Sequence, residues 1–136
     1  MAKVFLSHKS EDKVYVEKVV SLIGRNNCVY DKFTFEAGMK TIDEIMKGLD
    51  ESDLFVIFLS DKALNSRWVK MELRKSKELL DAHRILQIYP IIIDQNIQYN
   101  DSRIPSWMQK AYNIRPILSP KIASQKIRAR LAIVSV

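Results

Sequence analysis

Residues 54–73 read LFVIFLSDKALNSRWVKMEL, and they are the most informative part of the chain. The first six residues are apolar without interruption, a pattern typical of a strand that is buried on both faces of a sheet. A turn follows Leu59, and a helix begins whose first large residue is Trp68 and which is expected to run to about residue 82. This segment therefore predicts a buried strand followed directly by a helix, the unit of an α/β fold.

Glu72 is the unusual residue of this helix. It lies one turn after Trp68 on the same face, in an apolar stripe that also holds Leu64 and Leu79. The stripe starts close to the carboxyl end of a buried strand, where ligands bind in open α/β sheets. A carboxylate there costs desolvation free energy unless it has a task or a partner. Periodicity alone favours the alternative, a solvated glutamate or an ion pair with Arg67, Lys70, Lys75 or Lys77.

The rest of the chain continues the alternation of strands and helices. Further strands are expected at residues 3–7, 28–30, 85–93 and 114–118, with Pro90 indicating an edge or a bend. Further helices are expected after Ser10, after Thr41, around residues 106–111 and from Pro120. Because the strands are continuous apolar runs, we predict a flavodoxin-like, doubly wound, five-stranded parallel sheet with helices on both faces.

Three details of these helices can be tested directly. Ser10 is expected to cap the first helix, with Glu11 and Asp12 in its first turn. Gly24 is expected to end it. Its apolar face is expected to comprise Val14, Val16, Val19, Val20, Leu22 and Ile23. The last helix is expected to pack through Ile122, Ile127, Leu131 and Val134.

Length and composition predict a single domain, 1–136, with 47% hydrophobic residues and therefore a sizeable core. No apolar run reaches the roughly 18 residues of a membrane span, and charged residues follow the N-terminus too closely for a signal peptide. Cys28 is the single cysteine, so a cytoplasmic, reducing compartment is expected. The chain ends on apolar residues 131–136, and we expect a domain cut from a longer protein rather than a helix packed to its end.

The net charge of +6 raises the question of a phosphate-bearing partner. Most basic residues are interleaved with acids, so solvated helix faces are the favoured interpretation. A nucleic-acid binder that lacks sequence specificity is the weaker alternative. The basic residues approach clusters at Lys70, Arg74, Lys75 and Lys77, and at Lys121, Lys126, Arg128 and Arg130.

Several common chemistries have no motif here. Neither GxGxxG nor GxxxxGK[ST] occurs, and His8 and His83 lie in different elements, so no metal site is expected. A phosphoacceptor receiver domain would have this architecture, but it needs an acidic pair after the first strand and an aspartate after the third. The first strand ends in Ser7-His8 and the third in Leu59-Ser60, which excludes that class.

Taken in order, several short motifs resemble the TIR (Toll/interleukin receptor and resistance protein) domain family. The first-strand motif is VFLSH at residues 4–8 with SED at 10–12, and residues 31–38 resemble the second-strand loop with its glycine, Gly38. The most specific piece is Ser66-x-Trp68-x-x-x-Glu72-Leu73, and Ile104-Pro105-x-Trp107 resembles the late aromatic box. Two positions depart from the family pattern: Val69 replaces a frequent cysteine, and Ala37 a frequent proline.

This resemblance implies one of two functions. Some TIR domains cleave NAD+ at the nicotinamide–ribose bond, and a glutamate at the position of Glu72 is then catalytic. Nicotinamide leaves as a neutral molecule, so one ionised carboxylate suffices to stabilise the oxocarbenium-like transition state. NAD+ is then a substrate, and no cofactor is expected. The substrate-binding residues are expected to be Ser7, His8, Lys9, Phe33, Phe35, Ser60 and Trp68.

The second implied function is that of a non-enzymatic adaptor, which only assembles with other TIR domains. It predicts the same fold but needs no carboxylate at position 72, so Glu72 favours the enzyme. In both cases the partners are other copies of the domain, with a fused sensor or effector domain and no membrane. For Phe33 and Phe35 core packing is an equally weighted alternative, whereas for Trp68 the site is favoured over packing.

Overall fold

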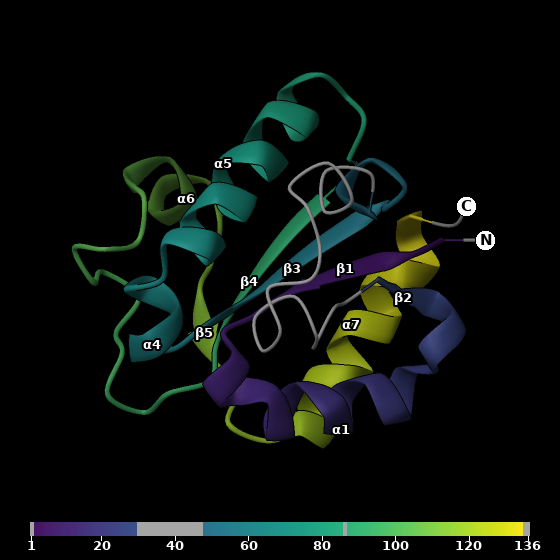
Figure 1. Cartoon of the computed structure of the whole chain (residues 1–136), viewed down its shortest axis with the longest axis horizontal. Helices are drawn as coiled ribbons and strands as arrows, with labels where there is room; N and C mark the ends of the chain where they lie inside the picture. Colours follow the sequence, from purple (N-terminus) through teal and green to yellow (C-terminus); the bar gives the residue numbers. More distant parts are fainter. Residues whose placement is uncertain (1, 30–47, 86, 135–136) are drawn as a thin grey trace.

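The computed structural model describes residues 2–29, 48–85 and 87–134 of the chain. Its sheet has five parallel strands in the order β2-β1-β3-β4-β5, which confirms the predicted flavodoxin-like, doubly wound arrangement (Figure 1). The strands are β1 (Val4–Ser7), β2 (Cys28–Val29), β3 (Leu54–Leu59), β4 (Gln87–Ile92) and β5 (Arg115–Pro116). The helices are η1 (Ser10–Asp12), α1 (Lys13–Ile23), η2 (Arg25–Asn27), α4 (Asp61–Leu64), α5 (Arg67–Asp81), α6 (Ser106–Ala111) and α7 (Pro120–Val134).

The central strand β3 shows why the chain builds two cores. Side chains alternate across a strand, and every residue of β3 is buried. Phe55, Ile57 and Leu59 belong to the core under α4, α5 and α6, and their neighbours Leu54, Val56 and Phe58 to the core under α1 and α7. Figure 1 shows these two helix layers on opposite sides of the sheet. A continuous apolar run therefore indicates burial on both faces, as predicted.

Pro90 lies inside the sheet rather than in an edge strand. β4 pairs with β3 on one side and with β5 on the other. The N–H of Ile93 donates to Leu59 of β3, so the backbone nitrogen of Pro90, an odd number of residues away, faces the β5 side. The pairing with β5 begins only at Ile91. Proline has no backbone N–H to donate. At Pro90 this costs no hydrogen bond of the sheet, because β4 is not yet paired with β5 at that position.

The start of the first helix differs from the prediction. Residues 10–12 form the short 3-10 helix η1, and α1 begins at Lys13. The Ser10 hydroxyl donates to the side chain of Glu11 at 2.9 Å, so Ser10 does not cap a helix. Gly24 does end α1, with a φ of 106° that suits glycine.

The apolar faces of α1 and α7 are narrower than the sequence indicates. In α1 the residues at helical spacing are buried, namely Val16, Val19, Val20 and Ile23, whereas Val14 and Leu22 are exposed. In α7 the prediction holds for Ile127 and Leu131, and Val134 is partly buried. Ile122 is exposed, and the small side chains of Ala123 and Ser124 fill its expected place. The packing of α1 against α7 decides which residues of each helix are buried.

Two remaining expectations concern the middle of the chain. The predicted second strand, 28–30, is present as Cys28–Val29, and Leu49 is fully buried. Tyr30, the loop 31–40 and the helix start at Thr41 lie outside the described residues. Among the residues that the structure describes, no helix is long and apolar enough to cross a membrane.

Candidate active site

Glu72 is buried in the middle of α5. The helix starts after Ser66, whose side-chain oxygen accepts a hydrogen bond from the N–H of Val69 at 3.2 Å. Its inward face comprises Val69, Glu72, Leu73, Ser76 and Leu79. Only 2% of Glu72 is exposed, so the interpretation as a solvated surface residue is wrong.

Ser7 comes to Glu72 because of strand alternation. Phe5 belongs to the core on the α5 side of the sheet, and Ser7, two residues later in β1, projects to the same side. The Ser7 hydroxyl donates a hydrogen bond of 2.9 Å to Oε1 of Glu72. Ser7 itself is fully buried and pairs with Ile57 of β3. A contact between residues 65 positions apart therefore joins the end of the first strand to the helix.

This hydrogen bond affects both the orientation and the energy of the carboxylate. Burying an ionised carboxylate is costly unless hydrogen bonds compensate for the lost water. A hydrogen bond to a charged group contributes about 1.5–3 kcal/mol. The Ser7 donor fixes the position of Oε1 near the carboxyl ends of β1 and β3. The result is a preoriented carboxylate at the edge of the sheet where α/β proteins bind ligands.

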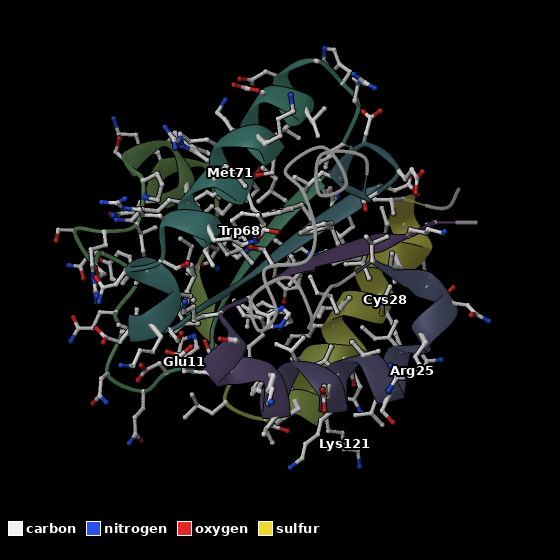
Figure 2. All side chains as sticks on the ribbon, in the orientation of Figure 1. Glu11, Arg25, Cys28, Trp68, Met71 and Lys121 are labelled. Atoms are coloured by element: carbon white, nitrogen blue, oxygen red, sulfur yellow. The ribbon has the colours of Figure 1, made fainter. Side chains whose placement is uncertain are left out.

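Trp68 accompanies Glu72 as the sequence predicts. It is half-buried and packs against the core on the α5 side of the sheet. Figure 2 shows its side chain between α5 and the sheet. Trp68 therefore packs against the core and also lies one helical turn from Glu72. Its contact with a substrate ring stays a prediction.

His8 and Lys9 follow Ser7 directly. His8 is buried, and its Nδ1 lies 3.1 Å from the carbonyl oxygen of Leu6, within hydrogen-bonding distance. Lys9 is partly exposed and precedes η1, where its carbonyl accepts from the N–H of Asp12 at 2.8 Å. The expected contact of these residues with the substrate stays a prediction, and the helix that follows them starts at Lys13 instead of Ser10.

Ser60 belongs to a different group of residues. Its side chain caps α4 by accepting from the N–H of Ala63 at 3.1 Å, and it donates to Asp12 at 2.5 Å. Burial raises the pKa of Asp12 and outweighs the lowering effect of the Ser60 hydrogen bond. Asp12 and Ser60 line a cavity of about 380 Å³ with Asp94 at the carboxyl ends of the strands. Asp12 was expected only as an acidic residue in the first turn of a helix. In the structure it lies at this edge of the sheet and is a neighbour of the candidate site.

Phe33 and Phe35, both predicted to contact the substrate, lie outside the described residues, as does Gly38. Within the predicted site the structure describes one direct contact, between Ser7 and Glu72. Trp68 lies one turn from Glu72 on α5, and His8 and Lys9 follow Ser7 in the chain. Sequence reasoning identified each of these residues but missed the pairing of Ser7 with Glu72. No spacing within the chain signals that contact, because it depends on how α5 crosses the sheet.

Comparison with known proteins identifies the class. Residues 4–123 match the family described as TIR domain, and the chain therefore belongs to the TIR domain family. Among solved structures it resembles the Clostridium botulinum CMP N-glycosidase BcmB, with a TM-score of 0.53 and 17% sequence identity. The alignment covers 95% of this chain and 99% of that one, so the two share the fold. Comparison with curated protein sequences gives no significant match.

Proposed function

We propose that the protein is an NAD+ nucleosidase that cleaves the nicotinamide–ribose bond. The products are nicotinamide and either ADP-ribose or a cyclic isomer of it. We further propose that self-association activates the enzyme in a defence or signalling pathway. The observation that carries the proposal is the buried carboxylate of Glu72, held by Ser7 at the ligand-binding edge of a TIR domain.

The chemistry requires little beyond this carboxylate. The leaving nicotinamide carries a positive charge on its ring nitrogen before cleavage and is neutral afterwards, so no general acid is needed. Positive charge develops on the ribose as the bond breaks, and a preoriented anion stabilises it most strongly where water is excluded. Only 2% of Glu72 is exposed, so its carboxylate is shielded from water, and the Ser7 hydroxyl keeps that carboxylate in place. Trp68 offers an apolar wall for the ring.

The structural neighbour suggests a related candidate with another base. BcmB is named as a CMP N-glycosidase. Cleavage of CMP between base and ribose breaks an N-glycosidic bond, the same kind of bond as that between nicotinamide and ribose in NAD+. A pyrimidine leaves less readily than nicotinamide, because it is not a cation before cleavage. Cleavage of NAD+ therefore needs only the carboxylate of Glu72, whereas cleavage of CMP also needs an acid, and this difference favours NAD+ as the substrate of this chain.

The deciding experiment compares the wild type with Glu72→Gln, which keeps the side-chain shape and removes the charge. Nicotinamide release from NAD+ and cytosine release from CMP are measured at high protein concentration. We expect NAD+ cleavage to fall by at least roughly 100-fold, equivalent to about 2.7 kcal/mol of transition-state stabilisation. The variant should remain folded, because a neutral amide is easier to bury than an anion.

Glu51→Gln is the matched control, because Glu51 is exposed and remote in sequence from α5. It should leave cleavage unchanged. A folded Glu72→Gln variant that cleaves NAD+ like the wild type would show that the catalytic assignment is wrong. Cytosine release without nicotinamide release would replace NAD+ by CMP as the substrate. A wild type that cleaves neither compound but self-associates would favour the adaptor.

A further inference from the structure

A second cavity, of about 650 Å³, opens on another side of α5. It lies between α5, α4 and the segment that leads into α6, the region on the left of Figure 1. From α5 it is lined by Val69, Lys70, Leu73, Arg74, Lys77 and Glu78. At 3.6 residues per turn these positions centre on the side of α5 that is turned away from Glu72. The cavity is therefore separate from the candidate active site.

The inner part of this cavity is apolar. Leu64, Val69 and Leu73 are buried at its floor, and Pro105 and Trp107 form the opposite wall. Among the described residues, no hydroxyl or amide side chain lines it. Its volume is in the range of small-molecule sites, which are mostly apolar with a few polar groups that fix orientation. The buried part of the lining offers no polar side chain to the edge of a nucleobase, so it suits a hydrocarbon body.

The basic residues of α5 at the rim of the cavity belong to the cluster that comprises Lys70, Arg74, Lys75 and Lys77. The structure divides that cluster into two pairs. Lys75 lies 3.5 Å from Glu78, and Lys77 lies 2.7 Å from Asp81 with its ammonium over the ring of Trp107. These two lysines are therefore neutralised by neighbours on their own helix.

Arg103, at one end of the cavity, is likewise held by Asp101 at 3.0 Å and by Asp61 at 2.9 Å. Lys70 and Arg74 differ, because within the described part of the chain neither has an acidic partner. They are exposed and stand one helical turn apart at the rim of the apolar floor. The carboxylate of Glu78 also lines the cavity, but Lys75 is its partner.

We propose that this cavity binds a small amphiphile with a flexible hydrocarbon body and one anionic head, either a carboxylate or a phosphate. The hydrocarbon would lie against Leu64, Val69 and Leu73, and the head would sit between Lys70 and Arg74. Two cations spaced to share one anion would otherwise repel each other across the rim. The proposal concerns a second ligand site and does not depend on whether the chain cleaves NAD+.

Binding is tested by calorimetry with decanoate and decyl phosphate below their micelle concentrations. Decanol and decylammonium serve as probes with the same chain and a neutral or cationic head. We expect both anions to bind and the other two to bind at least roughly tenfold more weakly, as for the loss of one charge-assisted contact. Methyl NMR gives the location: Leu64, Val69 and Leu73 should shift, and Leu131 in the opposite core should not.

The charge-reversed variant Lys70→Glu/Arg74→Glu should lose anion binding by at least the same factor, and Lys70→Gln/Arg74→Gln should lose part of it. Both sites are exposed, so the fold should persist. The control Lys121→Glu/Lys126→Glu makes the same change in net charge on α7, and Figure 2 shows Lys121 far from α5. It should bind like the wild type. Absence of anion binding, equal binding of decanol, shifts at Leu131, or binding that survives charge reversal would each overturn the proposal.

Discussion

Replacing Ser7 by alanine tests whether the hydrogen bond to Glu72 positions the carboxylate for cleavage. The change removes a single oxygen atom from a fully buried side chain, so it leaves almost no cavity. It removes the donor that lies 2.9 Å from Oε1 of Glu72. A hydrogen bond to a charged group contributes about 1.5–3 kcal/mol. If this contribution is expressed in the transition state, kcat should fall roughly 10- to 150-fold while KM changes little.

Ser124→Ala is the matched control for this experiment. Ser124 is also buried, and its hydroxyl donates to the carbonyl of Lys121 at 2.7 Å within α7, in the opposite layer. Its loss should lower the free energy of unfolding by about 1 kcal/mol and leave kcat unchanged. The assay is nicotinamide release over a range of pH, with unfolding in urea measured in parallel.

The pH profile separates positioning from general destabilisation. Without the Ser7 donor the ionised form of Glu72 loses a stabilising contact, so the acidic limb of the rate profile should move to higher pH. A merely structural serine would lower stability and leave this limb in place. A folded Ser7→Ala variant with the kcat and the pH profile of the wild type would refute the positioning role.

Three further predictions address other parts of the molecule. Burial raises the pKa of the Cys28 thiol to about 11, so alkylation by iodoacetamide at neutral pH should be much slower than that of a free cysteine and should accelerate on unfolding. Hydrogen bonds from Arg103 lower the pKa of Asp101 to about 2. The stability that this pair contributes is therefore present above about pH 4 and is lost as the pH falls through about 2. The variant Arg103→Gln should remove that part of the pH dependence of unfolding in urea. Specific NAD+-cleaving activity should rise with protein concentration if assembly completes the site, and constant specific activity from nanomolar to high micromolar protein would contradict this.

The sheet could be predicted because the sequence pattern and the physical requirement coincide. A strand that is covered on both faces must be apolar at every position, and residues 54–59 meet that condition in six consecutive residues. Alternation with amphipathic helices then leaves few topologies, because parallel crossovers are right-handed. Glu72 was recognisable for the same reason: a carboxylate in an apolar stripe conflicts with its local pattern, and such conflicts mark functional sites.

Which residues of an apolar arc are buried could not be read from the sequence. Val14, Leu22 and Ile122 are as apolar as their buried neighbours, yet they are exposed. The packing of α1 against α7 decides which side of each helix faces inward, and this depends on the crossing of the two helices.

The contacts of the polar side chains depend on tertiary structure in the same way. Ser7 and Glu72 are 65 residues apart, and they meet because α5 packs against β1 on that side of the sheet. The fold likewise brings Ser60, at the end of β3, to Asp12 of η1, although 48 residues separate them in the chain. The basic cluster on α5 is one patch in sequence, but the neighbouring acids and the wall at Trp107 separate Lys70 and Arg74 from the rest. Local pattern thus determined the elements and the unusual residue, whereas the pairing of side chains required the relative positions of elements that no local interaction fixes.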